Sequence, residues 1–238
     1  MQVEVREIGA GEADAEAVVW GMFEGDRPPP ELAGAAGAED ARGTLKSLTM
    51  VRPERPARAL VVGLGKRQEF DPERARVAAA VVAREAMQRE LTSLAWVPPE
   101  EGEPETIVEA LVTGTILGSY RFERFRHEAA EEQPKAELGS LTVLAAAALG
   151  EAARVARVGA VAQNRARDLQ NLPANVATPS FLAARAEEIG AAHEAIAVDV
   201  LRREEIVALG MGGLEAVSRG SAEEPVLVVI RYAGGGGG

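Results

Sequence analysis

The sequence predicts an α/β fold in which a mainly parallel sheet is flanked by helices. Short apolar runs alternate along the chain with segments of helical periodicity, which is the pattern of consecutive β-α-β units. Hydrophobic residues make up 47% of the 238 residues, so the chain can build a core. Aromatic residues make up only 4%, so Ala, Val and Leu must fill most of that core. At roughly 100–200 residues per domain, this length allows one large domain or two modest ones.

The first 150 residues contain five expected strands and two helices. Alternation or apolar runs predict strands at 3–8, 15–23, 60–62, 91–97 and 141–146, and the proline- and glycine-rich stretch 28–43 predicts loop or short helix. A helix should begin at Pro72, because Asp71 is a good N-cap and proline is harmless at the first helical position. Helical spacing of apolar residues marks Ala75, Ala78, Ala79, Val82 and Ala86 in this helix and Ile107, Ala110, Leu111 and Gly114 in the next.

A long helix is expected from Gly150 to about Asn171, because Pro173 keeps the residue before it out of the helical region. Thr178 and Pro179 repeat the N-cap and proline signal of a helix start. A short strand at 198–201, a short helix at 203–209 closed by Gly210, and an apolar strand at 225–232 should follow. The predicted apolar faces are Val155, Val158, Ala162 and Leu169 on the long helix and Leu182, Ala186 and Ile189 on the next.

Composition excludes several classes of function. The formal net charge of −11 disfavours a general electrostatic attraction to DNA or to acidic lipid. The absence of cysteine excludes disulfides, cysteine-zinc sites and thiol nucleophiles, and two histidines, His127 and His193, exclude a three-histidine metal site. No targeting segment or membrane span is visible, so a cytoplasmic protein is expected.

Three local motifs have both a structural and a functional interpretation. Gly63-Leu-Gly-Lys66 follows a strand but lacks the spacing of a phosphate-binding loop, so a turn at the strand end is favoured. His193-Glu194 lacks the second histidine of a zinc-protease helix, so the exposed end of a helix is favoured. Two basic groups favour a solvated or interdomain face over a nucleic-acid surface, because acidic residues interrupt the second: Arg52, Arg55 and Arg58, then Arg121, Arg124 and Arg126 interleaved with Tyr120, Phe122 and Phe125.

The densest polar stretch surrounds the end of the long helix. Asparagine side chains beside a proline turn can bond backbone groups that a helix end leaves free, so the stretch is interpreted as a structural elbow between domains. It has no pairing of a nucleophile with a base, and the acidic residues elsewhere form no recognisable cluster, so no catalytic or metal-binding residue is assigned. The elbow residues are Asn164, Arg167, Asp168, Asn171, Pro173 and Asn175.

Several segments, taken in order, resemble the leucyl (cytosol) aminopeptidase family. They are residues 60–66 (LVVGLGK), 114–122 (GTILGSYRF), 164–175 (NRARDLQNLPAN) with Thr178-Pro179, 210–221 (GMGGLEAVSRGS) and 225–232 (PVLVVIRY). The resemblance implies a macro-like N-terminal α/β domain at 1–150, a linker helix at 151–172 and the start of a catalytic α/β domain at 173–238.

The resemblance also implies a homohexamer in which two divalent metals, manganese or zinc, activate a water against the first peptide bond of a peptide substrate. The family's metal-binding blocks, approximately Lys-Gly-x-x-Phe-Asp-[Ser/Thr]-Gly-Gly and Asn-Thr-Asp-Ala-Glu-Gly-Arg, do not occur in this sequence. The chain is therefore expected to be the N-terminal part of such an enzyme, truncated before the metal site, with no metal bound and no activity alone. The alternative is a standalone macro-like module that binds a nucleotide or nucleic acid, and DNA is disfavoured by the charge.

Overall fold

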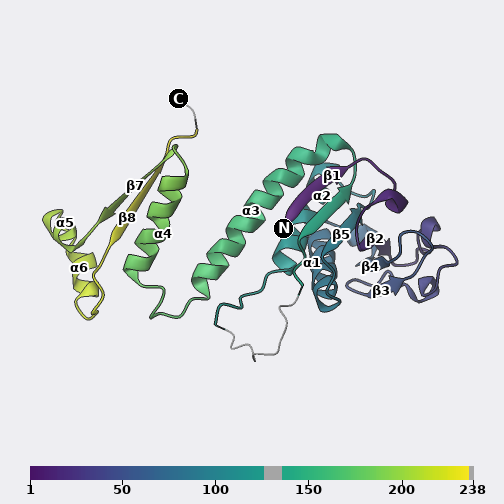
Figure 1. The fold of residues 1–238 in the computed structure, drawn as a ribbon, viewed down its shortest axis with the longest axis horizontal. Helices are drawn as coiled ribbons and strands as arrows, with labels where there is room; N and C mark the ends of the chain where they lie inside the picture. The colour runs from purple at the N-terminus through teal and green to yellow at the C-terminus, as the bar shows by residue number, and fades with distance from the viewer. Residues whose placement is uncertain (126–135, 236–238) are drawn as a thin grey trace. The chain divides into compact units, whose positions relative to one another are not determined.

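The computed structural model describes residues 1–125 and 136–235, and the chain divides into two units, Met1–Arg167 and Asp168–Gly238. The first unit is built on a six-stranded sheet with the order β1-β6-β5-β2-β4-β3 (Figure 1). Neighbouring strands are parallel except for the pair β3 and β4. The strands are β1 (Gln2–Arg6), β2 (Ala17–Phe23), β3 (Leu48–Val51), β4 (Ala59–Gly65), β5 (Ser93–Val97) and β6 (Ser140–Leu144). The prediction of a mainly parallel sheet is confirmed, whereas β3 was not predicted.

Helices cover one face of this sheet. α1 (Pro72–Gln88) begins as predicted, because the Asp71 side chain accepts a hydrogen bond from the Arg74 backbone N–H. α2 (Pro104–Gly118) packs closely against α1: a Cβ at Gly114 would lie 2.2 Å from the Arg76 carbonyl oxygen. All the residues predicted to form the apolar arcs of these two helices are buried.

A different kind of layer covers the opposite face. Alternate residues of β2 and β4 point to this side, and they pack against a segment that contains two single-turn 3₁₀ helices. Leu32, Ala38 and Ala41 of that segment are buried against Val18 and Trp20 of β2. The 3₁₀ helices of the first unit are η1 (Ala10–Glu12), η2 (Pro30–Leu32), η3 (Ala38–Asp40), η4 (Arg67–Glu69) and η5 (Ala147–Leu149).

The packed face of α3 (Gly150–Gln170) differs from the predicted one. The helix ends where Pro173 predicts, but Val155 and Val158 are 50% and 53% exposed. The buried residues are Ala153, Ala156 and Ala160. The prediction was wrong because it ranked residues by hydrophobicity, whereas the small alanine side chains allow this helix to lie close to its neighbours.

The second unit is a two-stranded sheet with three helices. α4 (Pro179–Ala192) starts as predicted, with the Thr178 hydroxyl accepting a hydrogen bond from the Phe181 N–H. β7 (Ile196–Leu201) and β8 (Leu227–Tyr232) pair antiparallel, and α5 (Arg203–Ala208) and α6 (Gly212–Ser218) lie between them in sequence. α6 was not predicted as a helix, because its glycines indicate a turn. On α4, Ala186 is buried as predicted together with Ala183, but Leu182 and Ile189 are 44% and 47% exposed.

No helix in the described ranges is both long enough and apolar enough to cross a membrane.

Candidate functional site

Gly63, Leu64 and Gly65 are the last three residues of β4, and the space beside the two glycines is filled by protein. A Cβ at Gly63 would lie 1.9 Å from the Thr44 carbonyl oxygen, and the Gly65 N–H donates to the Gly43 carbonyl over 2.8 Å. Gly65 also has a φ of +80°, which favours glycine. The two glycines therefore allow the close approach of residues 43–47. The prediction of a turn here was wrong, because backbone hydrogen bonds with residues 43–47 extend β4 to Gly65, and the single-turn helix η4 follows at Arg67.

Charged groups just beyond the carboxyl ends of β2, β4 and β5 neutralise one another. In open α/β sheets, ligands bind outside these ends. Here Arg67 bonds to Asp26 over 2.8 Å, pairs with Glu101, and lies over the Phe23 ring at 4.3 Å. This arginine is thus already held between two carboxylates, which makes it a poor partner for a phosphate. The sequence alone does not reveal this network, because its members are far apart in the chain and share no motif.

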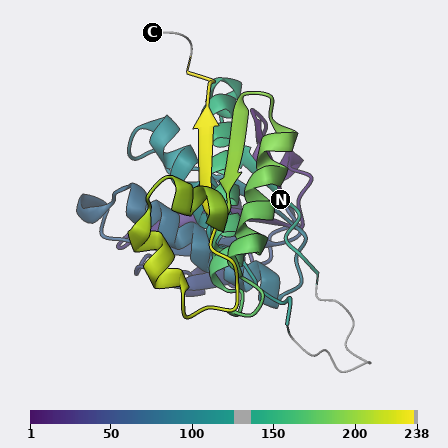
Figure 2. The ribbon, with the colours of Figure 1, turned by 90° about the vertical axis from the view of Figure 1, so that its left-hand side faces the viewer.

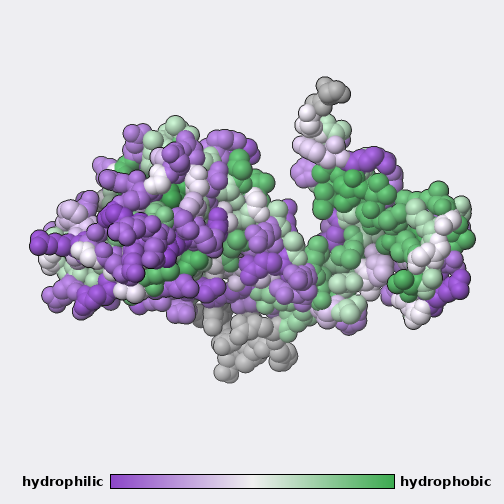
Figure 3. Space-filling view, turned by 180° about the vertical axis from the view of Figure 1, so that it is seen from behind, coloured by the Kyte–Doolittle hydropathy of each residue, from purple (hydrophilic) through white to green (hydrophobic). Residues whose placement is uncertain are grey.

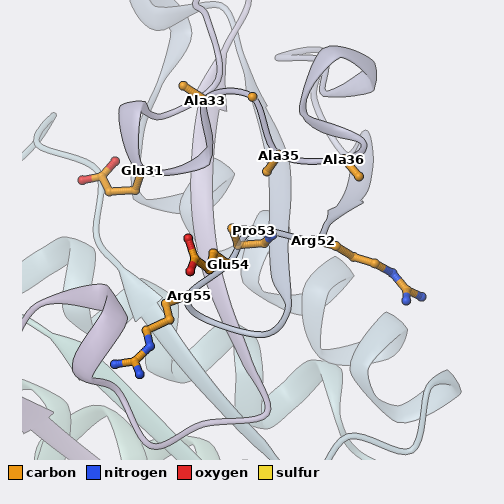
Figure 4. A pocket seen from close by; sticks show the side chains of 9 residues that line it. Glu31, Ala33, Ala35, Ala36, Arg52, Pro53, Glu54 and Arg55 are labelled. Carbon is orange, nitrogen blue, oxygen red and sulfur yellow. The ribbon is translucent and has the colours of Figure 1, made fainter.

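A pocket of about 720 Å³ lies beside the first basic group. It is lined by residues 31, 33–36 and 52–55, and Glu31 and Glu54 stand among its arginines. The guanidinium groups of Arg52 and Arg55 point in different directions in Figure 4. A phosphate site requires cationic or N–H donors that converge, so the pocket supports the interpretation of a solvated face. Arg58 also belongs to this group and is exposed.

The second basic group is involved in ring contacts. The Arg124 guanidinium lies over the Phe125 ring at 5.6 Å, and the Phe122 and Phe125 rings lie 5.9 Å apart. Arg126, His127 and Glu128 lie outside the described residues. His193 follows the last turn of α4, as the interpretation of an exposed helix end predicts.

Two of the predicted elbow residues cap α2. Asn164 donates to the Ile116 carbonyl over 3.1 Å, and Arg167 donates to the Leu117 carbonyl over 3.2 Å. Arg167 also donates to Asn164 Oδ1 over 3.0 Å and lies 3.8 Å from the centroid of the Tyr120 ring. The last carbonyls of a helix lack partners within it, and a cation is favourable there. These side chains therefore hold α3 against the end of α2 within the first unit.

The other elbow residues surround the turn that follows α3. The Pro173 carbonyl accepts hydrogen bonds from the N–H groups of Val176 and Ala177, which forms the turn before α4. Asn175 is exposed on this turn, and Asp168 and Asn171 lie at the end of α3 with interactions of their own. The structure thus brings the side chains of Asn164 and Arg167 together, whereas Asp168, Asn171, Pro173 and Asn175 lie at the end of α3 and on the turn that follows it.

The described part of the chain does not fit a two-metal centre. It contains no group of three or more His, Cys, Asp or Glu side chains that could hold a metal ion. A site of two divalent metals needs several converging oxygen or nitrogen ligands. No step of a metal-dependent reaction is therefore assigned to these residues.

The fold is thus that of an α/β protein whose first unit has its own core and whose second unit begins at Asp168, near the end of α3. Two models of the cytosol aminopeptidase family match the chain in the same order: the N-terminal domain matches residues 31–129, and the catalytic domain matches residues 164–237. The chain therefore belongs to the cytosol aminopeptidase family, in agreement with the resemblance found in the sequence.

Individual relatives agree with this assignment. A probable cytosol aminopeptidase of Roseiflexus castenholzii is 38% identical over 226 residues, covering 91% of this chain and 46% of the relative. One from Geobacter is 32% identical, covering 99% of this chain and 51% of the relative. The chain thus spans about half the length of these relatives.

Solved structures of similar fold give the same picture. The bottromycin maturation enzyme BotP is 26% identical with a TM-score of 0.75, over 90% of this chain and 45% of that one. A mutant of tomato leucine aminopeptidase is 22% identical with a TM-score of 0.82, over 97% of this chain and 50% of that one. The second likeness is evidence for the fold.

Proposed function

We propose that this chain is the N-terminal part of a metal-dependent leucyl aminopeptidase, which removes N-terminal residues from peptides. The observation that carries the proposal is the ordered match to both domain models of one family. The chain by itself is inactive, because its described residues provide no metal-binding cluster. The whole enzyme carries two divalent metals, manganese or zinc, and acts as a cytoplasmic homohexamer. A structure of the similar BotP in complex with Mn supports manganese as one candidate.

The proposed enzyme is divided into successive segments along the sequence. Residues 1–150 form the macro-like domain, residues 151–172 the linker helix and residues 173–238 the start of the catalytic domain. The Asn164 and Arg167 contacts with α2 support a linker that is held on the N-terminal domain. Asp168, Asn171, Pro173 and Asn175 then form the rest of the interdomain elbow.

A hydrolysis assay tests the proposal. The chain is incubated with leucine amide and added Mn²⁺ or Zn²⁺, and the Roseiflexus castenholzii relative is assayed in parallel as the positive control. We expect turnover by the relative and none by the chain alone. Robust metal-dependent turnover by the chain would contradict its inactivity. Reading the coding frame beyond Gly238 tests the larger claim, since a continuation that contains Lys-Gly-x-x-Phe-Asp is expected.

A standalone nucleotide- or nucleic-acid-binding module is not favoured. The space beside Gly63 and Gly65 at the end of β4 is filled, and Arg67 is held between two carboxylates. Titration with ADP-ribose and with duplex DNA at physiological salt should give no binding at high micromolar ligand. Saturable binding of either would revive this alternative.

A further inference from the structure

The two edges of the six-stranded sheet differ in how they are covered. At the β3 edge, the Arg52 N–H donates to the Ala36 carbonyl over 3.0 Å. The Thr49 hydroxyl donates to the Asp40 carbonyl over 3.3 Å, so the segment that contains η3 covers this edge. At the opposite edge, β1 has a neighbouring strand on one side only within the described residues (Figure 1). An uncovered edge strand presents its outward N–H and C=O groups to a further strand.

The register of β1 defines which backbone groups face outward. Hydrogen bonds from the Gln2 N–H and to the Arg6 carbonyl run to the segment that contains β6. Because such bonds come from every second residue of a strand, Gln2, Glu4 and Arg6 bond on the β6 side. The N–H and C=O groups of Val3 and Val5 therefore point to the free edge, while their side chains pack against the core.

A groove of about 480 Å³ lies beside this edge. One wall is formed by residues 2–5 of β1, and the other by Gly150, Ala153, Arg154 and Arg157 of α3. Their spacing places these four residues on one face of the helix. A Cβ added at Gly150 would meet nothing within 4 Å, so the groove is open at this position. An extended chain therefore has room to lie between β1 and α3.

The α3 wall of the groove carries a positive charge without a carboxylate partner. Arg154 is paired with Glu151 over 2.6 Å. Arg157 donates from Nε to the Met1 carbonyl over 3.1 Å, and within residues 1–125 and 136–235 no carboxylate pairs with it. Glu4 lies on the exposed face of β1, because side chains alternate along a strand. A carboxylate on an added strand would therefore complement Arg157.

A broad hydrophobic surface lies on the second unit instead. β7 and β8 lie side by side in Figure 2, and the surface of their unit is largely green in Figure 3. These residues fall within the catalytic-domain match at 164–237. On the face drawn in Figure 3, the first unit is mostly hydrophilic. This contrast favours a partner of the first unit that is recognised by backbone hydrogen bonds and charge.

We propose that the β1 groove, defined as the free edge of β1 with Arg154 and Arg157 of α3, binds an extended acidic peptide segment. The segment adds as a strand, exchanges backbone hydrogen bonds with Val3 and Val5, and pairs one carboxylate with Arg157. Backbone pairing supplies affinity, and the charge selects acidic segments. Residues 2–5 and 150–157 lie outside the ranges 31–129 and 164–237 that the family models match, and this binding does not depend on peptidase activity.

Fluorescence polarisation of a labelled peptide tests this proposal. The probe is N-acetylated Thr-Val-Asp-Val-Asp-Val-Thr, and we expect it to bind the 238-residue chain saturably. Two further peptides carry N-methyl groups on one or the other alternate set of amides. An N-methyl amide cannot donate a hydrogen bond, and only one set faces β1 in an added strand. We therefore expect one of the two N-methylated peptides to lose binding and the other to retain it.

Charge reversal locates the binding to the groove. Arg157→Glu should weaken binding of the probe about tenfold or more, because like charges then face each other. A peptide with Lys in place of Asp should bind Arg157→Glu more tightly than it binds the unsubstituted chain. Arg165→Glu is the matched control, since Arg165 is exposed on α3 but does not line the groove, and it should change affinity less than about twofold. Circular dichroism checks that both variants are folded.

Each outcome decides the proposal. Saturable binding that one N-methylated set and Arg157→Glu weaken supports it. Absence of saturable binding at high micromolar protein, binding that both N-methylated peptides retain, or equal effects of Arg157→Glu and Arg165→Glu overturns it. A dimer of the chain alone that Val5→Pro dissociates would identify a second copy as the occupant and also overturns it. Hydrolysis is not measured here, so a failure of the proposed function leaves these outcomes unchanged.

Discussion

The two units bury their apolar residues to very different extents. The first encloses both faces of its sheet, with helices on one side and the segment around η2 and η3 on the other. In the described part of the second unit, the buried hydrophobic residues are Ala183, Ala186 and Ile206. A small unit buries a smaller fraction of its surface and is correspondingly marginal. Regular helices and strands in this chain therefore do not indicate how stable the unit that contains them is.

The largest expected effect comes from the same substitution made in both units. Leu111→Ala removes a fully buried side chain of α2 and should lower the free energy of unfolding of the first unit by about 2–5 kcal/mol. Leu182→Ala removes a side chain of α4 that is 44% exposed, so its cost should be below about 1 kcal/mol. Hydrogen exchange in increasing urea, resolved by peptide, measures each unit separately. Equal costs would contradict the contrast between the units.

Two helical glycines give the next contrast. Gly114→Ala places a methyl group 2.2 Å from the Arg76 carbonyl oxygen, and we expect a loss of about 2–3 kcal/mol as α1 and α2 separate. At Gly159 of α3 an added Cβ meets nothing within 4 Å, so Gly159→Ala should stabilise by about 0.5–1 kcal/mol through helix propensity. Urea unfolding followed by circular dichroism measures both changes. A neutral Gly114→Ala would show that the helices do not need this close approach.

A smaller effect is expected at the cap that joins α3 to α2. Arg167→Ala removes the hydrogen bond to the Leu117 carbonyl and the contact with the Tyr120 ring, at a cost of about 1–2 kcal/mol. Arg167→Lys keeps the charge but loses the planar guanidinium group. The stability of this variant should therefore lie between that of the unsubstituted chain and that of Arg167→Ala. The exposed Arg165 provides the control, and Arg165→Ala should be near neutral. Thermal unfolding measures the Tm of each variant. Equal changes in Tm at Arg165 and Arg167 would contradict the claim that Arg167 stabilises the contact between α3 and the end of α2.

The smallest effect depends on pH. The hydrogen bond from Arg74, helped by the charge of Lys66, holds the pKa of Glu69 below its ordinary value of 4.5. The ionised carboxylate therefore stabilises the first unit above pH 4.5, and this contribution is lost as the pH falls from 4.5 through the lower pKa of the folded state. Glu69→Gln should flatten this part of the Tm-against-pH profile. The same substitution at the exposed Glu109 should leave it unchanged, and identical profiles for both variants would count against the pairing with Arg74.

Helix starts could be predicted from the sequence, but the packed faces of the later helices could not. Asp71 and Thr178 act as the N-caps that their sequence predicts, because capping depends on residues within one turn. The apolar arc of α1 was also correct. On α3, however, Val155 and Val158 are half exposed while alanines are buried, since the fit between helices decides which face packs.

The candidate site shows the same division between local and distant information. The glycines at Gly63–Gly65 predicted a turn, but β4 continues through them because residues 43–47, distant in sequence, pair with its end. The Arg67 network could not be predicted either, because it joins residues 26, 67 and 101, which only the fold brings together. For Asn164 and Arg167 the polar character of the elbow was evident, but their acceptors on α2 depend on where Ile116 and Leu117 end that helix.

Both tryptophans of the chain, Trp20 and Trp96, are buried in the first unit, on β2 and β5. Intrinsic tryptophan fluorescence therefore reports on the first unit alone. A change confined to the second unit should leave this emission unchanged. Tyr232→Trp would give the second unit an emission of its own, obtained as the difference between the spectra of the substituted and unsubstituted proteins.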